Sequence, residues 1–565
     1  MMKRKFALAV IFCVATASAG MGRPSRAISG KITYKGKQAG TAIVKLYKLY
    51  VSSEGQVTQL SKREIYGAAE PFRTIKLEKA GPYTFSELPA GRYSVLAFVD
   101  TDGNGELSFN RPEPFGWFSS EPAGGFEAIN ITKSDVNDAD FKLRFPTHFP
   151  KKDKRIEHGA LRWIKGLAVL QLWGSSEERG FAHGYLVGGQ IIDFLEFYVI
   201  EDSWKSAKRY EEIFVPFLKS HLNCPAEFLA ECRALINGMK ASGIDMRVES
   251  LGRDFELMDL LAINAYIEKR AAFEVPVPSS CTQFAFWGAQ TEASEVGGGL
   301  IAGRNMDGEC DVRKVTVSHF LVFAVEPSEP GRKRWVSTMW PGFVGTISGV
   351  NEDGLYSMEN AGGSGPGPVV GGIVPCSWVQ RYILENQGSG ATAESILKMM
   401  QKFKCEGGGV TTPGSIILWA AARHKQSAPA FVYEGDRFGG AMRMPTDVRP
   451  NDATNIMAAN HHLVYGCDRD RPGCSFRKEA SFSSRWRYEV GMNMVEAWSR
   501  QKKPIGIAEM KRLLQTVAHG TTEYSVIFLA NEKRIFIAVD DLKCDMWDAP
   551  FMDWVEFEFD ELFSR

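Results

Sequence analysis

A short segment near the middle of the 565-residue chain constrains the fold more than any other feature. Ser279-Ser280-Cys281-Thr282-Gln283-Phe284 places a cysteine at the start of an aromatic, strand-like run, directly after Val275-Pro276-Val277-Pro278. Proline lacks an N–H donor and favours extended backbone, so this pattern predicts an accessible loop that ends a helical region just before Cys281. The segment therefore predicts a junction between helices and a sheet, at which a cut would leave Cys281 as a new chain N-terminus.

The strand that starts at Cys281 is expected to pair with the strand at 300–305, across the turn-rich stretch 291–299. The centre of an antiparallel hairpin between Cys281 and Asn305 falls inside that stretch. Arg304 and Asp307, in the segment Gly303-Arg304-Asn305-Met306-Asp307, would then return beside the thiol. This pairing predicts a cation and a carboxylate next to Cys281.

Cys281, Arg304 and Asp307 have complementary uses in acyl transfer. A nearby arginine favours the thiolate of a cysteine, and Asp307 is suited to hold a freed α-amine in position. Such an amine has a reference pKa of about 7.7–8.0, so one N-terminal residue supplies both nucleophile and general base and needs no histidine. The alternative interpretation is that Arg304 and Asp307 form a structural ion pair.

Acyl transfer also needs donors where negative charge develops on oxygen. Two asparagines are suitable: Asn360 in Asn360-Ala361-Gly362-Gly363, and Asn460 in Asn460-His461-His462. Asn360 fits equally well as a cap on a glycine-rich turn.

The order of these motifs resembles the N-terminal nucleophile (Ntn) hydrolases, and most closely the autoproteolytic isopenicillin-N acyltransferase group. Acid ceramidase and N-acylethanolamine amidase carry a similar Arg-Asn-Met-Asp segment. The Arg179-Gly180…His183-Gly184 run and Ser483-Ser484-Arg485 are also similar to that group. The resemblance covers roughly residues 157–545.

The resemblance implies an α+β fold with four layers, αββα, and self-cleavage between Ser280 and Cys281. It implies Cys281 as nucleophile and base, with Arg304 and Asp307 as its electrostatic partners. It assigns the oxyanion donor to Asn460, with Asn360 and Arg485 as further candidate residues.

The activity implied by the resemblance is hydrolysis or transfer of the acyl group of a linear amide through a Cys281 thioester, without a cofactor. The partners would be a small N-acyl or lipid-like substrate and the second fragment of the same chain. Two alternatives stay open: a phospholipase-B-like ester hydrolase, and an inactive Ntn-like secreted binding protein.

The N-terminus has the pattern of a secretory signal. Lys3-Arg4-Lys5 precedes an apolar run at 6–14 and then Ala17-Ser18-Ala19, so we expect a signal peptide at 1–19, cleavage after Ala19 and export. The destination would be periplasmic or secreted, or lysosomal in a eukaryotic host. The run is too short for a retained transmembrane helix, and no later segment is long and apolar enough.

Charge argues against nucleic-acid or anionic-membrane binding. Lys+Arg and Asp+Glu both number 67, which leaves no basic surplus.

The cysteine count is consistent with one reserved thiol. Ten cysteines are present, and after loss of Cys13 and a cut before Cys281 an even number remains in each piece besides Cys281, with Cys224 and Cys232 in the first.

Composition divides the chain into three parts. Residues 28–145 carry short alternating strands with Gly/Pro turns, which predicts a small β-sandwich. Leu88-Pro89-Ala90-Gly91-Arg92-Tyr93 resembles transthyretin-like or carboxypeptidase-regulatory sandwiches. A Pro/Lys-rich linker at 146–156 would join the sandwich to the Ntn-like domain at 157–565.

One loop of the predicted sandwich is a weak calcium candidate. Asp100, Asp102 and Asn104 alternate, with Gly at the sixth position, as in the first half of an EF-hand loop. Arg111 stands where the bidentate glutamate of that loop belongs, so an Asx-rich turn is the alternative interpretation.

Periodicity predicts the remaining elements. Helices are expected at 178–199, 210–220, 226–239, 255–269, 376–385, 393–403, 486–499 and 507–517, and strands at 282–288, 300–305, 315–325, 333–339, 343–350, 355–360, 525–529 and 534–539.

Overall fold

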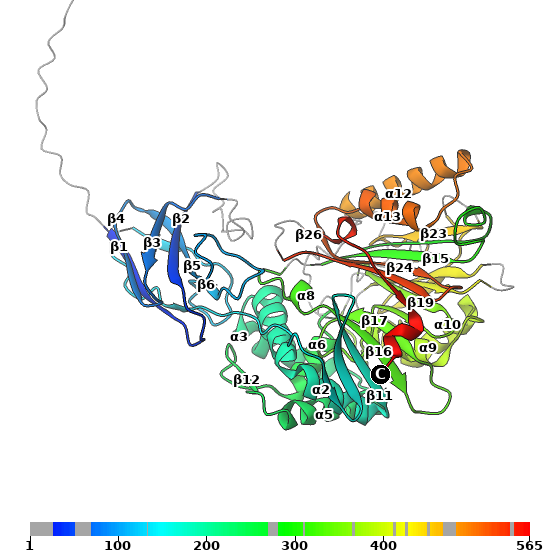
Figure 1. Ribbon diagram of the computed structural model, residues 1–565, viewed down its shortest axis with the longest axis horizontal. Helices are drawn as coiled ribbons and strands as arrows, with labels where there is room; N and C mark the ends of the chain where they lie inside the picture. The colour runs from blue at the N-terminus through cyan, green and yellow to red at the C-terminus, as the bar shows by residue number, and fades with distance from the viewer. Residues whose placement is uncertain are drawn as a thin grey trace, which may run out of the picture.

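The computed structural model describes residues 26–50, 69–132, 134–268, 281–308, 311–363, 368–410, 414–423, 428–448, 453–466, 482–542 and 547–565. The expected signal peptide and Ser280 of the expected cleavage site lie outside these residues. The described chain consists of a small β-rich part at the N-terminus and a larger body in which helices enclose two sheets (Figure 1).

The N-terminal part is built from two small sheets that pack face to face. One sheet has the order β4-β1-β8 and the other the order β3-β2-β5-β6, with β7 also paired to β5. In β4 buried and exposed residues alternate at its start, as expected for a strand with one face on a core. The strands are β1 (Arg26–Thr33), β2 (Thr41–Leu49), β3 (Arg73–Leu77), β4 (Pro82–Leu88), β5 (Gly91–Asp100), β6 (Phe115–Trp117), β7 (Ile129–Ile131) and β8 (Phe141–Lys142).

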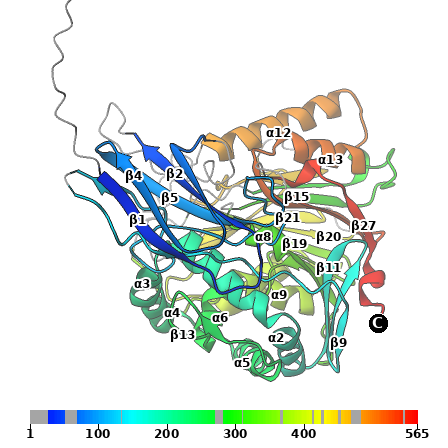
Figure 2. The same cartoon turned by 60° about the vertical axis from the view of Figure 1, so that its left-hand side comes forward.

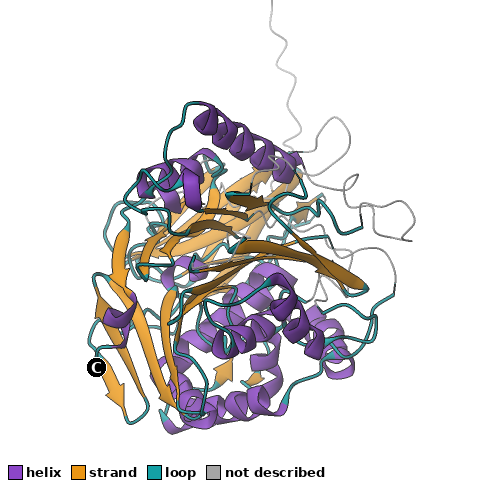
Figure 3. Cartoon of the chain, turned by 90° about the vertical axis from the view of Figure 1, so that its right-hand side faces the viewer, coloured by secondary structure: helices purple, strands orange, loops and turns teal. Residues whose placement is uncertain are grey.

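The body has an α+β architecture with four layers. A ten-stranded and a seven-stranded sheet lie against each other, with one group of helices outside each (Figure 3). The ten-stranded sheet has the order β22-β21-β20-β19-β18-β17-β16-β11-β10-β9, and the other the order β23-β14-β15-β24-β25-β27 with β26 beside β24. Almost continuous burial along the central strands reflects their cover on both faces.

The strands of the body have the following bounds. The first sheet contains β9 (Lys154–Ile156), β10 (Gly159–Ile164), β11 (Leu167–Gly174), β16 (Leu321–Pro327), β17 (Trp335–Met339), β18 (Ser348–Asn351), β19 (Leu355–Ala361), β20 (Ser415–Ala421), β21 (Ala430–Asp436) and β22 (Gly439–Arg443). The second contains β14 (Thr282–Phe286), β15 (Ile301–Asp307), β23 (Asn455–Ala458), β24 (Thr521–Leu529), β25 (Arg534–Val539), β26 (Trp547–Asp548) and β27 (Val555–Glu558), and a short ribbon joins β12 (Arg247–Val248) to β13 (Arg253–Asp254).

Helices form the two outer layers. On the side of the ten-stranded sheet lie α2 (Ser176–Asp193), its π-helical continuation η1 (Phe194–Trp204), α3 (Ala207–Arg209), η2 (Tyr210–Phe214), α4 (Val215–His221), α5 (Ala226–Ala241), α6 (Leu257–Asn264), α9 (Cys376–Asn386), α10 (Ala393–Met400) and η4 (Gln401–Phe403). On the other side lie α12 (Phe482–Arg500) and α13 (Ile507–Thr516), and short turns elsewhere are η3 (Gly288–Gln290), α8 (Val315–Ser318), η5 (Ala549–Phe551) and η6 (Phe559–Phe563). Within the described residues, no helix combines the length and apolar content that a membrane crossing needs.

The expected hairpin at the cysteine is confirmed. β14 and β15 pair antiparallel, with Thr282 opposite Asn305 and Gln283 opposite Arg304. β23 flanks β14 and β24 flanks β15, so this hairpin lies inside the seven-stranded sheet. The cysteine strand is therefore held on both edges.

Two expected strands differ from the structure, and of the one expected at 343–350 only β18 (Ser348–Asn351) is present. Residues 315–325, expected as one strand, form α8 followed by β16, because the Asp311 carboxylate accepts the N–H groups of Val315 and Thr316 and starts a helical turn. The expected helix at 210–220 is confirmed as η2 and α4, and Pro216 lies within the first two residues of α4, where an N–H donor is not needed. The chain therefore continues as a helix through Pro216.

Candidate active site

Cys281 lies at the start of β14 and is only 3% exposed. Its Sγ atom is 3.3 Å from Arg304 Nη2, 3.7 Å from Met306 Sδ and 3.9 Å from the Asp307 carbonyl oxygen. The sequence-predicted pairing of Cys281 with Arg304 is therefore present.

Arg304 is fixed by the layer that faces it. Its Nη1 donates to the Ile347 carbonyl and to Ser348 Oγ, each at 2.6 Å, and its Nη2 donates to the Glu359 carbonyl at 2.6 Å. Groups from both sheet layers thus meet at one guanidinium, and the positive charge stays directed at the sulfur.

Burial raises the pKa of the Cys281 thiol, and the Arg304 charge opposes this effect only in part. Arg304 lowers the pKa of the thiol, as expected, but desolvation of the buried thiol raises that pKa by more. A separate base is therefore needed to remove the thiol proton.

Asp307 reaches this region because of an irregularity in β15. A register shift between Met306 and Asp307 against β24 changes the strand's regular alternation and re-aims the side chain. The fully buried carboxylate accepts a hydrogen bond from Thr522 Oγ1 at 2.5 Å, and its Oδ2 lies 3.3 Å from His519 Nε2. Within the described residues Oδ2 accepts no hydrogen bond, and apart from the nearby His519 ring it is open to a further donor.

The two asparagines bind the backbone of Cys281 from both sides. Asn460 Oδ1 accepts the Cys281 N–H at 2.8 Å, and Asn360 Nδ2 donates to the Cys281 carbonyl at 3.1 Å. Gln283 Nε2 donates to Asn360 Oδ1 at 2.6 Å and fixes that amide. Asn460 Nδ2 donates to the Ala361 carbonyl at 2.7 Å, and since an amide NH₂ carries two donors, its second N–H has no acceptor among the described residues.

Arg485 and Arg487 have different positions on α12. Arg485 is exposed. Arg487 is fully buried, and its Nη1 donates to the Cys281 carbonyl at 2.6 Å and to Thr282 Oγ1 at 2.7 Å. Its Nη2 donates to Asn460 Oδ1 at 2.7 Å. The arginine of this helix that contacts the candidate nucleophile is therefore Arg487.

Helical periodicity was the signal that could have identified Arg487. Ser484, Arg487, Tyr488 and Gly491 follow the spacing of one helix face and are all buried, whereas Arg485 falls outside that spacing. Ser484 Oγ accepts the Asn460 N–H at 2.8 Å, so the same face also positions the asparagine.

His519 and Thr522 were also missed by sequence reasoning. Thr522 lies opposite Asp307 in the β15–β24 register, so pairing of the late strand at 525–529 with β15 was the signal needed. His519 precedes that strand, and no local pattern marks it.

The described cysteines give no support to the parity argument. Cys224, Cys232, Cys281, Cys376 and Cys405 are all free thiols. Cys224 and Cys232, which the count left as a possible pair, are therefore not joined. The interpretation of Cys281 as the one thiol reserved for chemistry therefore rests on its contacts alone.

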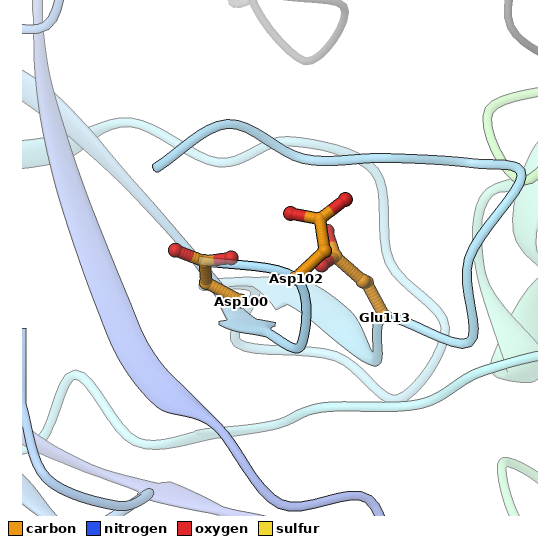
Figure 4. Close-up of side chains that lie close together, drawn as sticks. All are labelled: Asp100, Asp102 and Glu113. Carbon is orange, nitrogen blue, oxygen red and sulfur yellow. The ribbon is translucent and has the colours of Figure 1, made fainter. Parts of the chain in front are cut away.

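The loop after β5 gathers three carboxylates: Asp100, Asp102 and Glu113 have oxygen atoms within 4.8 Å of one another (Figure 4). Asp100 accepts the Gly103 and Gly105 N–H groups at 2.7 and 2.9 Å, and Asp102 Oδ1 accepts the Asn104 N–H at 3.1 Å. Of these, the Asp102–Asn104 bond is that of an Asx turn, whereas Asp100 gathers N–H groups from farther along the loop. Asn104 directs its side-chain amide at Asp102, and a calcium site here stays a prediction.

Comparison with known proteins gives distant similarities. No protein-family model matches the chain. A curated protein of Archaeoglobus fulgidus, described as uncharacterized, is 22% identical over 348 residues; the match covers 58% of this chain and 54% of that protein. The chain thus spans about half the length of this curated relative.

Solved structures with partial similarity include three hydrolases. They are the Caenorhabditis elegans N-acylethanolamine-hydrolyzing acid amidase ortholog (TM-score 0.31, 14% identity, 44% of this chain and 93% of that one), a mutant of conjugated bile acid hydrolase from Clostridium perfringens (0.31, 10%, 50% and 93%) and penicillin V acylase from Agrobacterium tumefaciens (0.29, 14%, 46% and 83%). Similarity at this level carries no argument about activity.

Proposed function

We propose that the chain is an autoproteolytic Ntn-type hydrolase that cleaves a linear N-acyl amide through a thioester on Cys281. One observation carries the proposal: side chains from β15, β19, the segment at 460 and α12 meet at the sulfur, N–H and carbonyl of this single residue. Such convergence on both the side chain and the backbone of one cysteine suits a nucleophile that is also a chain terminus.

Self-cleavage would use the same sulfur. Cys281 Sγ forms a bond to the Ser280 carbonyl carbon, the Ser280–Cys281 C–N bond breaks, and the departing α-amine takes up the thiol proton. Water then hydrolyses the thioester and leaves a Ser280 carboxylate and a free Cys281. Arg304, 3.3 Å from the sulfur, stabilises negative charge on it during attack.

Turnover would follow the same course with the substrate in place of Ser280. The α-amine accepts the thiol proton, sulfur bonds to the acyl carbon, and the leaving amine takes that proton as the amide C–N bond breaks. The α-amine of Cys281 then acts as base for the water that hydrolyses the thioester, and this step restores the thiol. Oδ2 of Asp307, which accepts no hydrogen bond within the described residues and has His519 Nε2 at 3.3 Å, is suited to hold the α-ammonium between these steps.

Oxyanion stabilisation falls to Asn460 in this proposal. The second N–H of its amide is a donor beside the Cys281 backbone, and loss of such a donor typically costs about 2.7–4 kcal/mol of transition-state stabilisation. We include export in the proposal because of the N-terminal pattern; N-terminal sequencing of exported protein should then start at Gly20.

The test is denaturing electrophoresis with N-terminal sequencing of the wild type and of Cys281→Ala, beside a screen of N-acyl amides and ester lipids. Wild type should give two fragments, one of which starts at Cys281, and Cys281→Ala should stay in one piece and be inactive. Cys405→Ala, which removes another buried thiol, is the matched control and should match the wild type.

Two outcomes contradict the proposal. An active enzyme that keeps its Ser280–Cys281 bond excludes the N-terminal amine as base. If the enzyme hydrolyses ester lipids but no N-acyl amides, the phospholipase-B-like alternative is the correct function.

A further inference from the structure

The loop that leaves Asp307 joins the candidate active site to the N-terminal sandwich. Residues 311–314, here named the clamp loop, lie between the end of β15 and α8. Just after β15 the Gly308 N–H donates to the Thr521 carbonyl at 2.9 Å. At the end of the loop Lys314 is fully buried, with Nζ 3.1 Å from the Asp541 carbonyl. The body thus holds the chain on both sides of the loop.

The middle of the clamp loop belongs to the sandwich. Val312 is 7% exposed and lies in a hydrophobic cluster that otherwise consists of sandwich residues, among them Phe98, Phe115 and Trp117. This cluster is separate from the core between the two small sheets. The second face of the β2-β5-β6 sheet is therefore covered in part by a residue that follows Asp307 by five positions.

Arg313 makes the polar half of the same contact. Its Nη1 donates to the carbonyls of Phe115 and Arg144, at 3.1 and 3.0 Å, and its Nε donates to Glu201 at 2.5 Å. The guanidinium carbon lies 4.4 Å from the Phe115 ring centroid, within cation–π range. Arg313 thus ties two sandwich carbonyls to an acid of η1.

Charges of the sandwich and the body alternate around this contact. Arg144, which follows β8, forms ion pairs with Glu196 and Glu201 of η1, and Arg313 shares Glu201. Arg313, Glu196 and Glu201 are all buried. Removing one partner of such a pair typically costs about 3–5 kcal/mol, because a buried charge is left uncompensated. Loss of Arg313 or of Glu201 alone should therefore destabilise the docked sandwich.

A tethered binding module would be attached differently. Independent modules are joined by exposed linkers with few crossing contacts, whereas here the sandwich receives a side chain from the loop next to the candidate catalytic carboxylate. Both views of the molecule place the sandwich beside the α3 and α8 side of the body (Figures 1 and 2). Docking of the sandwich and the position of Asp307 are thus linked through one short segment.

We propose that the sandwich is a positioning domain, which fixes the clamp loop through Val312 and Arg313 and so holds Asp307 where the α-amine of Cys281 needs its carboxylate. This rests on the proposed function for the role of Asp307. Val312 and Arg313 are positioning residues, because neither touches the reacting atoms.

Arg313→Lys in the full-length chain tests the proposal. Lysine keeps the charge but not the fork that reaches Glu201 and two carbonyls together. We expect kcat on an N-acyl amide to fall about 10²-fold with KM unchanged, since a displacement of about 1 Å at a catalytic group has that effect. We also expect a shifted pH–rate profile, because Asp307 sets the environment of the basic amine.

Lys142→Gln is the matched control. It removes an exposed ion pair between the sandwich and the body, with Glu249 at 2.9 Å, that does not involve the clamp loop. Its kcat, KM and pH–rate profile should equal those of the wild type. A purely structural role of docking would affect thermal stability in Arg313→Lys without moving the pH–rate profile.

Val312→Ala keeps the proposal testable if Arg313→Lys does not fold. It removes only two methyl groups from the sandwich cluster, and kcat should fall with KM unchanged. Wild-type kcat and pH–rate profile in the variants would overturn the proposal.

Hydrogen exchange separates failure of this proposal from failure of the proposed function. If the wild type stays uncut and hydrolyses no N-acyl amide, the function fails, but the link between sandwich and Asp307 is still measurable. Amides of 305–308 and 311–315 should then exchange faster in Val312→Ala than in wild type or Lys142→Gln. Equal exchange would overturn the positioning role.

Discussion

For α12, the sequence motif and the buried helix face point to different arginines, Arg485 and Arg487. Ser483-Ser484-Arg485 resembles a family segment, but Arg485 is exposed and Arg487 binds the Cys281 carbonyl at 2.6 Å. Residues two apart on a helix lie on nearly opposite faces. At this scale, the identity of a site residue depends on the periodicity of its helix more than on its place in a short motif.

Arg487→Gln should strongly reduce activity, whereas Arg485→Gln should not. Burial lowers the pKa of Arg487, while Asp307 and Cys281 oppose that effect, so the guanidinium belongs to the charge balance of the site. Glutamine removes a charged donor from the Cys281 carbonyl and from Asn460 Oδ1, and we expect a loss of about 10²–10³-fold in kcat, as for other lost donors of this kind.

The measurement is kcat and KM of both variants, with circular dichroism to compare their folds. Arg485→Gln is the matched control on the same helix. Equal activity of the two variants would show that Arg487 has no part in the reaction.

Sequence reasoning at the residue scale succeeded where contacts are set by strand pairing. Cys281 and Arg304 follow from one hairpin, whose register the turn-rich stretch fixes. Thr522 and His519 require a strand more than two hundred positions away, and Arg487 requires the orientation of a helix. Such long-range placements depend on tertiary packing, which one sequence read locally does not specify.

At the scale of elements, the Arg179-Gly180…His183-Gly184 run has a packing explanation. A Cβ atom on Gly180 or Gly184 of α2 would overlap the Glu231 or Leu235 carbonyl of α5, and a Cβ on Gly238 of α5 would overlap the Phe181 carbonyl. The two helices therefore approach each other backbone to backbone. The run identifies a helix pair in the outer layer of the body.

Gly184→Ala should destabilise the protein, and Gly189→Ala on the same helix should not. An added methyl at Gly184 must push α5 away, at a typical cost of about 1–3 kcal/mol. At Gly189 no atom lies within 4 Å of the added Cβ, so the better helix propensity of alanine should give a gain of about 0.5–1 kcal/mol.

Chemical denaturation of both variants, in a Cys281→Ala background that keeps the backbone state equal, measures the difference. Opposite signs are expected. A destabilised Gly189→Ala, or an unaffected Gly184→Ala, would contradict close α2–α5 packing in solution.

The expected strand at 315–325 shows why element type is hard to read from apolar residues alone. Val315, Val317 and Val322 suit a strand, yet the first two lie in α8, because the Asp311 carboxylate accepts the first N–H groups of that turn. β-Branched residues prefer strands only weakly, and these local side-chain hydrogen bonds outweigh the preference.

At the scale of the whole molecule, the two expected fragments are parts of one sheet. β9, β10 and β11 precede Cys281, and β11 pairs in parallel with β16 from Val169 opposite Val322 to Gly174 opposite Pro327. Separation of the fragments would break a continuous ladder and expose the core on both sides.

We therefore expect the fragments to co-elute from size-exclusion chromatography in native buffer, at the volume of uncut Cys281→Ala. They should separate only in denaturant. Separation in native buffer would show that the sheet does not hold the cleaved protein together.

The pH dependence of folding belongs to the whole molecule, because its sources lie in different layers. Glu268, the last described residue before the junction, accepts the Cys376 N–H at the start of α9 at 2.8 Å. Burial, with Glu359 nearby, raises the pKa of Glu268 from 4.5 to about 7. Folded protein thus holds this proton where the unfolded chain has released it.

The sign follows directly. The contribution of Glu268 to stability is fully present below pH 4.5 and is lost as pH rises to about 7. Burial acts in the opposite direction on His183 and His461, whose pKa values fall from 6.5 to about 3 and about 4, so their contribution to stability is present above pH 6.5 and is lost as pH falls toward those values. The comparison must therefore be a difference between two proteins that share these histidines.

Glu268→Gln removes the titration and keeps a neutral side chain of similar size. Relative to its parent in a Cys281→Ala background, it should gain about 3 kcal/mol of unfolding free energy between pH 4.5 and pH 7 and no more above, since one pKa unit corresponds to about 1.4 kcal/mol. Denaturant titrations at several pH values measure this difference, with Glu394→Gln, the same substitution at an exposed position of α10, as the matched control. If the difference in unfolding free energy between Glu268→Gln and its parent is the same at every pH, the Glu268 carboxyl keeps an ordinary pKa. Glu268 would then contribute nothing to the loss of stability as pH rises.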